Sequence, residues 1–179
     1  HKQGQGGLFF KEQMIDHYNE GMGVFQQRYY EKIDHFEGPG SPVFVILGGE
    51  DPLEGLLYPF VYDHLALEYG GYAAALEHRF FGESMPLTNP TNADLHHLLA
   101  VRQALLDIVR FVEYKTNELG CSRDRSSPDY CPVITVGGSY PGFLSALMRF
   151  NHSDVVDISY ASSAPFNLYS HHLDPGAYY

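Results

Sequence analysis

The sequence has few basic residues and no long hydrophobic run. Its 179 residues include 11 Lys and Arg against 22 Asp and Glu, which gives a formal net charge of −11. A surface of this sign repels the phosphates of nucleic acids and of anionic lipids, so we expect no nucleic-acid partner and no charged membrane surface as a partner. Because no run of about 20 apolar residues is present, the sequence predicts no membrane-spanning helix.

The sequence also lacks the residue spacings that hold metal ions. No two histidines have the H-E-x-x-H spacing of a zinc protease, and the spacing of the two cysteines is not that of a zinc site. We therefore expect no metal. The chain begins at His1 and shows no signal-peptide pattern, so we expect a processed or incomplete chain.

Two cysteines, Cys121 and Cys131, bracket a polar loop. Their spacing suits a disulfide that closes this loop, and two free thiols are the alternative. A disulfide would imply an oxidising compartment. A glycosylation sequon begins at Asn151, near the expected end of a helix, and it would carry a glycan in a secreted protein. Together these features favour the secretory pathway over the cytosol.

Short apolar runs alternate with helix-like segments along the chain. We expect residues 1–13, rich in Gly and Gln, to be loosely ordered, and residues 14–179 to form one unit. Strands are predicted at residues 24–30, 43–47, 72–77, 133–136 and 155–160, and helices at 58–69 and 93–119 and directly after residue 139. Strands separated by helices at this rhythm predict an α/β fold with a mostly parallel sheet.

The most informative stretch is residues 133–147, where an apolar run reaches Gly137-Gly138-Ser139 and an apolar helical pattern follows. A strand–turn–helix of this kind holds a nucleophilic serine above the sheet edge, and the amide of Tyr140 could then face an oxyanion. The G-x-S-x-G pattern would place glycine where Pro141 stands. Proline is tolerated in a first helical turn, although it disfavours helical dihedrals at the residue before it. The alternative is a serine in a glycine-rich turn without chemistry.

Several motifs give the chain a family resemblance. Gly137-Gly138-Ser139-Tyr140-x-Gly142 resembles the lysosomal Pro-X carboxypeptidase and dipeptidyl peptidase II family of serine peptidases. Further stretches fit the same family in the same order, from about residue 14 to about residue 170: Phe25-x-Gln27-Arg28-Tyr29, Gly48-x-Glu50, Glu77-His78-Arg79-Phe80-Phe81-Gly82-x-Ser84, Gln103-Ala104-Leu105-x-Asp107 and Ala161-x-Ser163-Ala164-Pro165. Motifs distributed in this way are more specific than the serine turn alone.

The resemblance implies an α/β-hydrolase fold, here its N-terminal part with flanking helices, truncated before the cap domain and the last strands. It implies a serine exopeptidase that cleaves short peptides next to proline, with Ser139 as the nucleophile and no cofactor. The amide of Tyr140 would be one oxyanion donor, and the backbone of Gly49 or Glu50 the second. Glu50 could also hold a substrate amino terminus, or only cap a helix. A peptide substrate, a possible homodimer and a lysosomal, vacuolar or extracellular location are implied as well.

The rest of the triad is expected outside this chain. In α/β-hydrolases the Asp and the His follow the serine on later strands, so we expect both beyond residue 179. We do not expect His171, His172 and Asp174 to replace them, because no strand would bring them back over Ser139. The 179-residue chain alone is therefore predicted to be inactive.

Three questions stay open at this point. Glu77, His78 and Arg79 could support the serine turn, line the pocket, or form a buried ion-pair network that fixes loop geometry. The chain could be a non-catalytic or truncated homologue without a triad. A lipase or esterase on the same fold is a further alternative, although Gly48-Gly49-Glu50 lacks the His-Gly-Gly-Gly form of many esterases.

Overall fold

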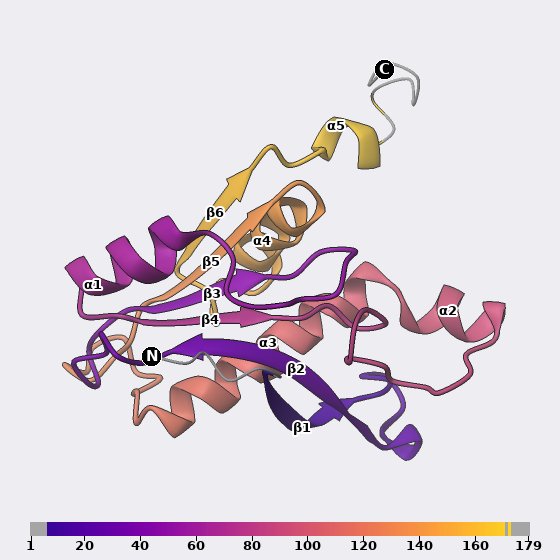
Figure 1. Cartoon of the computed structure of the whole chain (residues 1–179), viewed down its shortest axis with the longest axis horizontal. Coiled ribbons are helices and arrows are strands. Elements are labelled where there is room, and N and C mark those ends of the chain that lie inside the picture. The colour runs from indigo at the N-terminus through magenta and orange to yellow at the C-terminus, as the bar shows by residue number, and fades with distance from the viewer. Residues whose placement is uncertain (1–6, 171, 173–179) are drawn as a thin grey trace.

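A six-stranded sheet with helices on both faces forms the protein (Figure 1). The structure is a computed structural model, and it describes residues 7–170 and 172. The strands are β1 (Leu8–Met14), β2 (Val24–Lys32), β3 (Val43–Leu47), β4 (Tyr72–Leu76), β5 (Val133–Gly138) and β6 (Ile158–Ser162). Their order in the sheet is β1-β2-β4-β3-β5-β6. The four strands β4, β3, β5 and β6 are parallel, whereas β1 and β2 run antiparallel at one edge, which confirms the mostly parallel α/β sheet.

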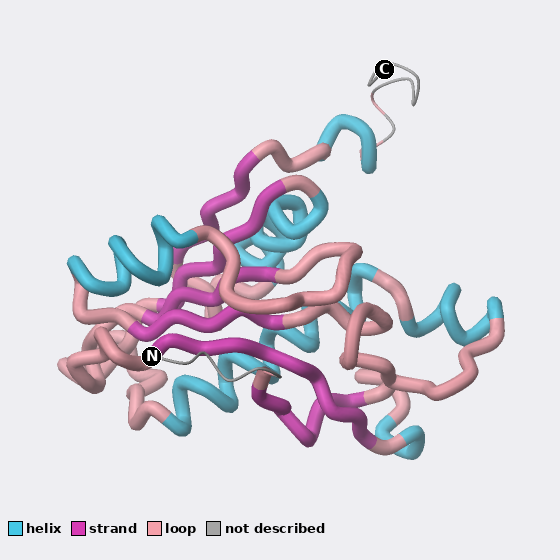
Figure 2. Tube along the Cα trace, viewed as in Figure 1, coloured by secondary structure: helices cyan, strands magenta, loops and turns pink. Residues whose placement is uncertain are grey.

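Two layers of helices cover the sheet (Figure 2). The helices are η1 (Glu20–Met22), the π-helix η2 (Phe60–Leu65) continued by α1 (Ala66–Glu68), α2 (Asn92–Leu98), α3 (Val101–Glu118), α4 (Tyr140–Asn151) and α5 (Phe166–Tyr169). Side chains of α3 and α4 pack on one face of the sheet, and side chains of η2 and α1 pack on the other.

The centre of the sheet is apolar on both faces, as the sequence predicts for β3. Every residue of β3 and β4 is buried. Val43, Val45 and Leu47 belong to the core under α3 and α4, whereas Phe44 and Ile46 belong to the core under η2 and α1. This alternation follows from the two-residue period of a strand. The sheet therefore gives a rigid floor to the loops at its carboxyl edge.

The expectation of a loosely ordered start is wrong for residues 8–13. These residues lie in β1, which pairs antiparallel with β2. Phe10 and Gln13 point inward, and the Gln13 amide donates to Oε1 of Gln27 at 2.8 Å and to the carbonyl of Asp107 at 3.0 Å. Paired backbone and buried contacts order this edge strand although its sequence is rich in polar residues. Residues 1–6 lie outside the described part of the chain.

The single helix predicted at residues 93–119 is also wrong, because it is two helices. Leu99 and Ala100 leave the helical conformation between α2 and α3. The carbonyl of Leu98 accepts a hydrogen bond from Nη1 of Arg79 at 3.0 Å. A buried guanidinium thus takes an acceptor that a continuous helix would use internally.

The last strand begins later than predicted. Val155 and Val156 form a buried turn, and both of their amides donate to the carbonyl of His152. Strand β6 starts only at Ile158, beyond Asp157. Residues 155–156 are therefore apolar because they are buried in the core, and not because they form a strand.

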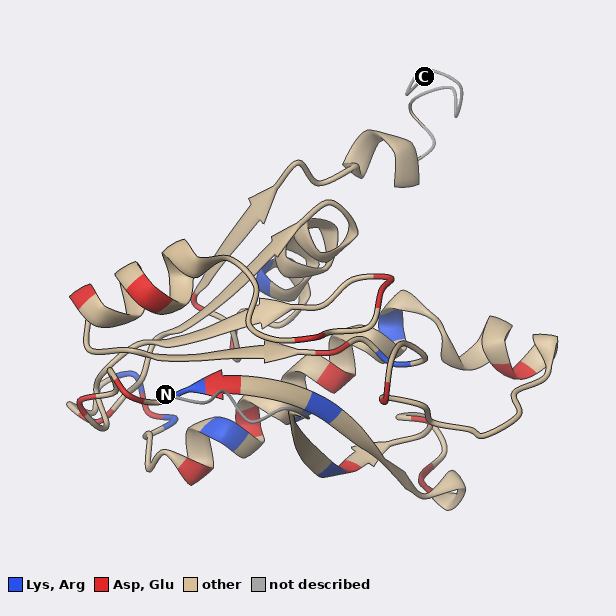
Figure 3. Cartoon of the chain, in the orientation of Figure 1, with Lys and Arg blue, Asp and Glu red and all other residues tan. Residues whose placement is uncertain are grey.

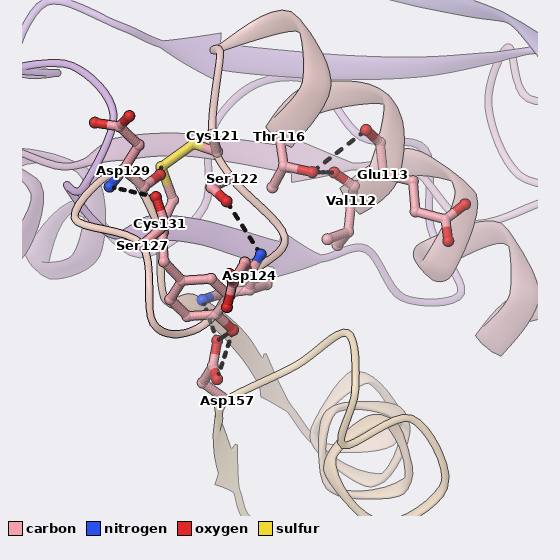
Figure 4. The surroundings of a disulfide bond; sticks show 12 residues. Val112, Glu113, Thr116, Cys121, Ser122, Asp124, Ser127, Asp129, Cys131 and Asp157 are labelled. Carbon is pink, nitrogen blue, oxygen red and sulfur yellow. Dashed lines mark hydrogen bonds between the residues drawn. A yellow bond between two sulfur atoms is a disulfide. The ribbon is translucent and has the colours of Figure 1, made fainter.

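A disulfide joins Cys121 to Cys131 and closes the loop between α3 and β5, the pairing that the spacing predicts (Figure 4). Asp157 anchors the other side of this loop. Its carboxylate accepts from the Tyr130 hydroxyl at 2.8 Å and from the amide of Val133 at 2.8 Å. These hydrogen bonds hold the N-terminal end of β5 next to the N-terminal end of β6.

Charge is unevenly distributed over the molecule (Figure 3). Strands β5 and β6 and helix α5 contain no Lys, Arg, Asp or Glu, and α4 contains only Arg149. The acidic residues lie mainly on the other elements and the loops. Within the described residues, no helix has the length and apolar character needed to cross a membrane.

Candidate active site

The turn from β5 to α4 holds Ser139 in a strained conformation. Its φ of 58° and ψ of −130° lie in a region that L-residues rarely adopt. The amide of Ser139 donates to the carbonyl of Ser162 at 2.9 Å, and its own carbonyl accepts from the amide of Phe143 at 3.1 Å. Ser139 is exposed. A backbone that costs about 1–3 kcal/mol persists only when its surroundings fix it, and such residues gather at functional sites.

Glycines around the serine allow this sharp turn. A Cβ atom on Gly137 would overlap the carbonyl of Pro141, and one on Gly142 would lie 2.8 Å from the carbonyl of Ser162. A Cβ atom on Gly138 would lie 2.8 Å from the hydroxyl of Tyr58. Only glycine therefore lets β5, α4 and β6 approach closely enough to form the turn.

Three amides beside the serine have no hydrogen-bond partner in the described structure. They are the backbone N–H groups of Tyr140, Gly49 and Glu50, the three donors that the resemblance implies. The loop after β3 lies against the first turn of α4, because a Cβ atom on Gly49 would be 3.2 Å from Cγ of Pro141. The first amides of a helix have no partner within that helix, and here such an amide lies beside an exposed serine. This arrangement can receive an oxyanion.

Glu77 holds the loop after β3 in place. Its buried carboxylate accepts from the amide of Leu53 at 2.8 Å, from Arg28, and from the hydroxyl of Ser84 at 2.6 Å. It also accepts from the amide of Glu83 at 3.0 Å. One carboxylate thus ties β2 and two loops to the end of β4.

Arg79 forms a second buried network. Its guanidinium donates to both carboxylate oxygens of Asp107, at 2.6 Å and 2.7 Å, and to the carbonyl of Met14 at 2.9 Å. His17 reaches the same carboxylate at 2.7 Å. The interpretation as buried ion pairs is therefore confirmed for Glu77 and for Arg79, which belong to two separate networks.

His78, between these two residues, faces the active-site turn instead. Its Nδ1 lies 2.8 Å from the carbonyl oxygen of Arg79, and its Nε2 lies 3.0 Å from the Tyr140 hydroxyl. Burial lowers the pKa of His78. Burial, with the negative charge of Glu50 as a second cause, raises the pKa of the Tyr140 hydroxyl. Both groups are thereby held neutral.

A cavity of about 890 Å³ opens beside Ser139. Its walls come from β3, η2, β5 and β6 and from the loops next to them, and no charged side chain lines it. Tyr58, Ser139 and Ser163 all line this cavity, and they are three of the four non-glycine residues with positive φ among the residues described. Sequence reasoning missed Tyr58 and Ser163 as cavity residues. A positive φ at a tyrosine leaves no pattern in the sequence.

The described residues contain no second member of a triad in contact with Ser139. No His, Asp or Glu side chain within residues 7–170 and 172 hydrogen-bonds to its hydroxyl. His172 instead contacts the hydroxyl of Ser170 at 2.6 Å, while His171 and Asp174 lie outside the described residues. Nor do three His, Cys, Asp or Glu side chains of this part of the chain meet in a group that could hold a metal ion.

The remaining candidate residues lie on the surface. Glu50 is exposed on the loop beside Tyr140. Asn151 is exposed at the last residue of α4, at the opposite end of that helix from Ser139. A twelve-residue helix is about 18 Å long, so a glycan on Asn151 would stay clear of the serine.

A strained serine between a parallel strand and a helix, at the carboxyl edge of such a sheet, is the arrangement of an α/β-hydrolase. The chain has this fold. The structure described as a post-proline cleaving enzyme from Rickettsia typhi matches 90% of this chain and 21% of its own, with a TM-score of 0.58 and 13% sequence identity. At that identity the likeness establishes the fold alone.

The family follows from the sequence comparisons. The profile of the serine carboxypeptidase S28 family matches residues 13–174, and the chain belongs to this family. "Prolyl carboxy peptidase like protein 5" of Caenorhabditis elegans is 38% identical over 145 residues, which are 79% of this chain and 27% of that protein. Lysosomal Pro-X carboxypeptidase of Mus musculus is 31% identical over 163 residues, 88% of this chain and 32% of that protein. The chain thus spans less than a third of the length of these relatives.

Proposed function

We propose that this chain carries the nucleophile and the oxyanion donors of a serine exopeptidase that cleaves short peptides next to proline. The observation that carries the proposal is the exposed, strained Ser139 flanked by three unpaired amides. Membership of the S28 family supports a peptide substrate, and the names of the two relatives support a preference for proline.

In the proposed reaction, Ser139 Oγ attacks the peptide carbonyl and forms an acyl-enzyme, which water then hydrolyses. The amide of Tyr140 and an amide of Gly49 or Glu50 would stabilise the negative oxygen of the tetrahedral intermediate. Loss of one such donor typically costs about 3 kcal/mol of transition-state stabilisation. The free state of these amides supports their assignment, since no hydrogen bond among the described residues has to break before they bind the oxyanion.

We further propose that the general-base His and its Asp come from residues that this chain does not contain. Two findings support this: the chain spans less than a third of its relatives, and Ser139 has no such partner among the described residues. Glu50, exposed beside Tyr140, is proposed to hold the substrate's amino terminus. A lysosomal, vacuolar or extracellular location, a glycan on Asn151 and a homodimer remain parts of the proposal, and the Cys121–Cys131 disulfide is consistent with the first.

The test compares the product of the complete reading frame with its Ser139→Ala variant. Both are assayed on a prolyl peptide and on a short acyl ester, next to the 179-residue chain. We expect peptide turnover that disappears in the variant, and none from the chain alone. Turnover of the ester without the peptide would favour an esterase, and prolyl-peptide turnover by the 179-residue chain would overturn the placement of the triad.

A second candidate is a non-catalytic homologue, since no His among the described residues hydrogen-bonds to Ser139. Under this alternative the complete product would hydrolyse neither substrate, and Ser139 would not react with a fluorophosphonate.

A further inference from the structure

The Tyr140 hydroxyl and the His78 ring form a contact with a defined direction. A carbonyl oxygen can only accept a hydrogen bond, so His78 Nδ1, at 2.8 Å from the Arg79 carbonyl, carries a proton. In the neutral ring Nε2 is then an acceptor, and the Tyr140 hydroxyl, 3.0 Å away, is its donor. The lowered pKa of the buried ring agrees with this neutral form.

Tyr140 is held by its side chain as well as by its backbone. It is the first residue of α4, and Pro141 directly after it disfavours helical dihedrals at Tyr140. Its amide makes no hydrogen bond within the described residues, but the same peptide plane is held by the Ser139 carbonyl, which accepts from the amide of Phe143 at 3.1 Å. The side chain is held as well, because the ring packs edge-on against His78 with centroids 5.4 Å apart.

The element that carries His78 is itself rigid. His78 is only 7% exposed, and its neighbours in sequence are the two buried network residues Glu77 and Arg79. These two residues bind β1, β2, α3 and the loops around the site. Because the residues before and after His78 are both fixed, the His78 ring can position Tyr140, which it contacts.

We propose that His78 is a positioning residue: its neutral imidazole accepts the Tyr140 hydroxyl and thereby keeps the Tyr140 amide directed at the oxyanion formed on Ser139. This inference rests on the proposed function, since it assigns the amide its purpose. His78 takes no part in proton transfer. The contact adds a second restraint to the backbone hydrogen bond between the Ser139 carbonyl and the amide of Phe143.

The first test reads the contact itself on the product of the complete reading frame. In ¹⁵N NMR spectra we expect a pyridine-type resonance for His78 Nε2 and a pyrrole-type resonance for Nδ1. The Nε2 resonance should move in Tyr140→Phe but not in Tyr130→Phe, a matched control that loses a hydroxyl bond to Asp157 at the other end of β5. A pyrrole-type Nε2 in the wild-type chain would overturn the inference whatever the activity of the enzyme.

The second test is a double-mutant cycle on the product of the complete reading frame. We expect Tyr140→Phe and His78→Leu each to lower kcat about 10-fold with little change in KM, and the double variant to match either single variant. His78→Gln, which can return an acceptor near Nε2, should recover most of kcat. Tyr130→Phe should leave kcat unchanged.

The outcomes separate the inference from the function on which it rests. Additive losses in the double variant, or an unchanged kcat in Tyr140→Phe, would overturn the positioning role while the peptidase stands. A product that hydrolyses no peptide, with the NMR contact intact, would overturn the proposed function and with it the catalytic purpose of the contact. Should His78→Leu fail to fold, Tyr140→Phe decides alone, because it keeps the ring and the amide.

Discussion

Ser139 illustrates how a single residue can be placed at the expense of stability. Its positive φ is fixed by two backbone hydrogen bonds and by glycines on either side that no larger residue could replace. The side chain gains exposure at the carboxyl edge of the sheet. At this scale the structure supports reactivity rather than stability.

Replacing Ser139 with glycine should therefore stabilise the chain. Glycine adopts a φ of 58° without a steric penalty, so relief of strain should exceed the entropy cost of glycine and raise the free energy of unfolding by about 1 kcal/mol. Urea unfolding at pH 7 measures this difference. Ser139→Ala, which keeps the Cβ atom, is the matched control and should show no such gain. Equal stabilities of all three proteins would show that the turn is unstrained.

Asp16 gives a residue-scale prediction for pH. Burial opposes its ionisation, but hydrogen bonds from Gln103, from the amide of Tyr18 and from His97 outweigh burial and lower the pKa of Asp16 to about 2. The folded state thus favours the ionised form. This stabilisation is present above the unfolded pKa near 3.8 and is lost as the pH falls through about 2.

The Asp16→Asn variant should consequently lose about 2 kcal/mol of stability at pH 7, at about 1.4 kcal/mol per pKa unit. The difference from the wild-type chain should shrink as the pH falls from 4 towards 2. Urea unfolding across this range checks the trend. A difference that stays constant with pH would mean that the charge of Asp16 does not contribute.

At the scale of elements, buried ionic networks set the loops around the serine. Glu77 connects β4 with β2 and with the loop that carries Gly49 and Glu50. The Arg79 network breaks the predicted long helix into α2 and α3. Packing of the sheet places the strands, whereas these networks place the loops.

Glu77→Gln should destabilise the chain by about 3 kcal/mol. The variant leaves the guanidinium of Arg28 partly buried without its charged partner, and an amide NH₂ would face the donors of Glu83 and Ser84. Asp63→Asn, which removes the exposed pair with Lys32, should cost less than about 1 kcal/mol. Thermal or urea unfolding compares the two, and similar losses would contradict the role given to Glu77.

The strands that packing places could be predicted from the sequence, whereas the features that side-chain hydrogen bonds place could not. Apolar runs and glycines predicted β3, β4, β5 and the serine turn, because burial on both faces and tight turns leave strong patterns. The break at Leu99 could not be predicted, since the hydrogen bond that accompanies it comes from the side chain of Arg79, distant in sequence. Strand β1 was missed because its order comes from pairing with β2 and from Gln13, a polar residue buried by specific hydrogen bonds. Support of the serine turn by His78 was one of the alternatives that the sequence left open, and the partner Tyr140 could not be named because the two residues are distant in sequence.

At the scale of the whole molecule, one edge of the sheet has no neighbouring strand in the described part of the chain. Strand β6 is the outermost strand beside β5 in the described part of the chain, and Ile158 and Tyr160 on it are 55% and 61% exposed. These residues continue the apolar wall of the cavity next to Ser139. An apolar strand at an open edge is a template for association.

The 179-residue chain should therefore self-associate at micromolar concentrations. Replacing Ile158 and Tyr160 together with lysine should restore a monomer in sedimentation velocity experiments, because it places charge on the edge strand. Phe150→Lys, a change at an aromatic residue that is 87% exposed on α4, is the control and should not. A monodisperse wild-type chain would contradict this prediction, and so would equal rescue by the control.

The most direct test of the account is the site at which a fluorophosphonate reacts with the product of the complete reading frame. Mass spectrometry of the digested protein should find one adduct, on Ser139, and Ser139→Ala should abolish it. Ser126→Ala, a change in the exposed disulfide loop, should leave the adduct intact. An adduct on another serine, or peptide hydrolysis that survives in Ser139→Ala, would contradict the assignment of Ser139 as the nucleophile.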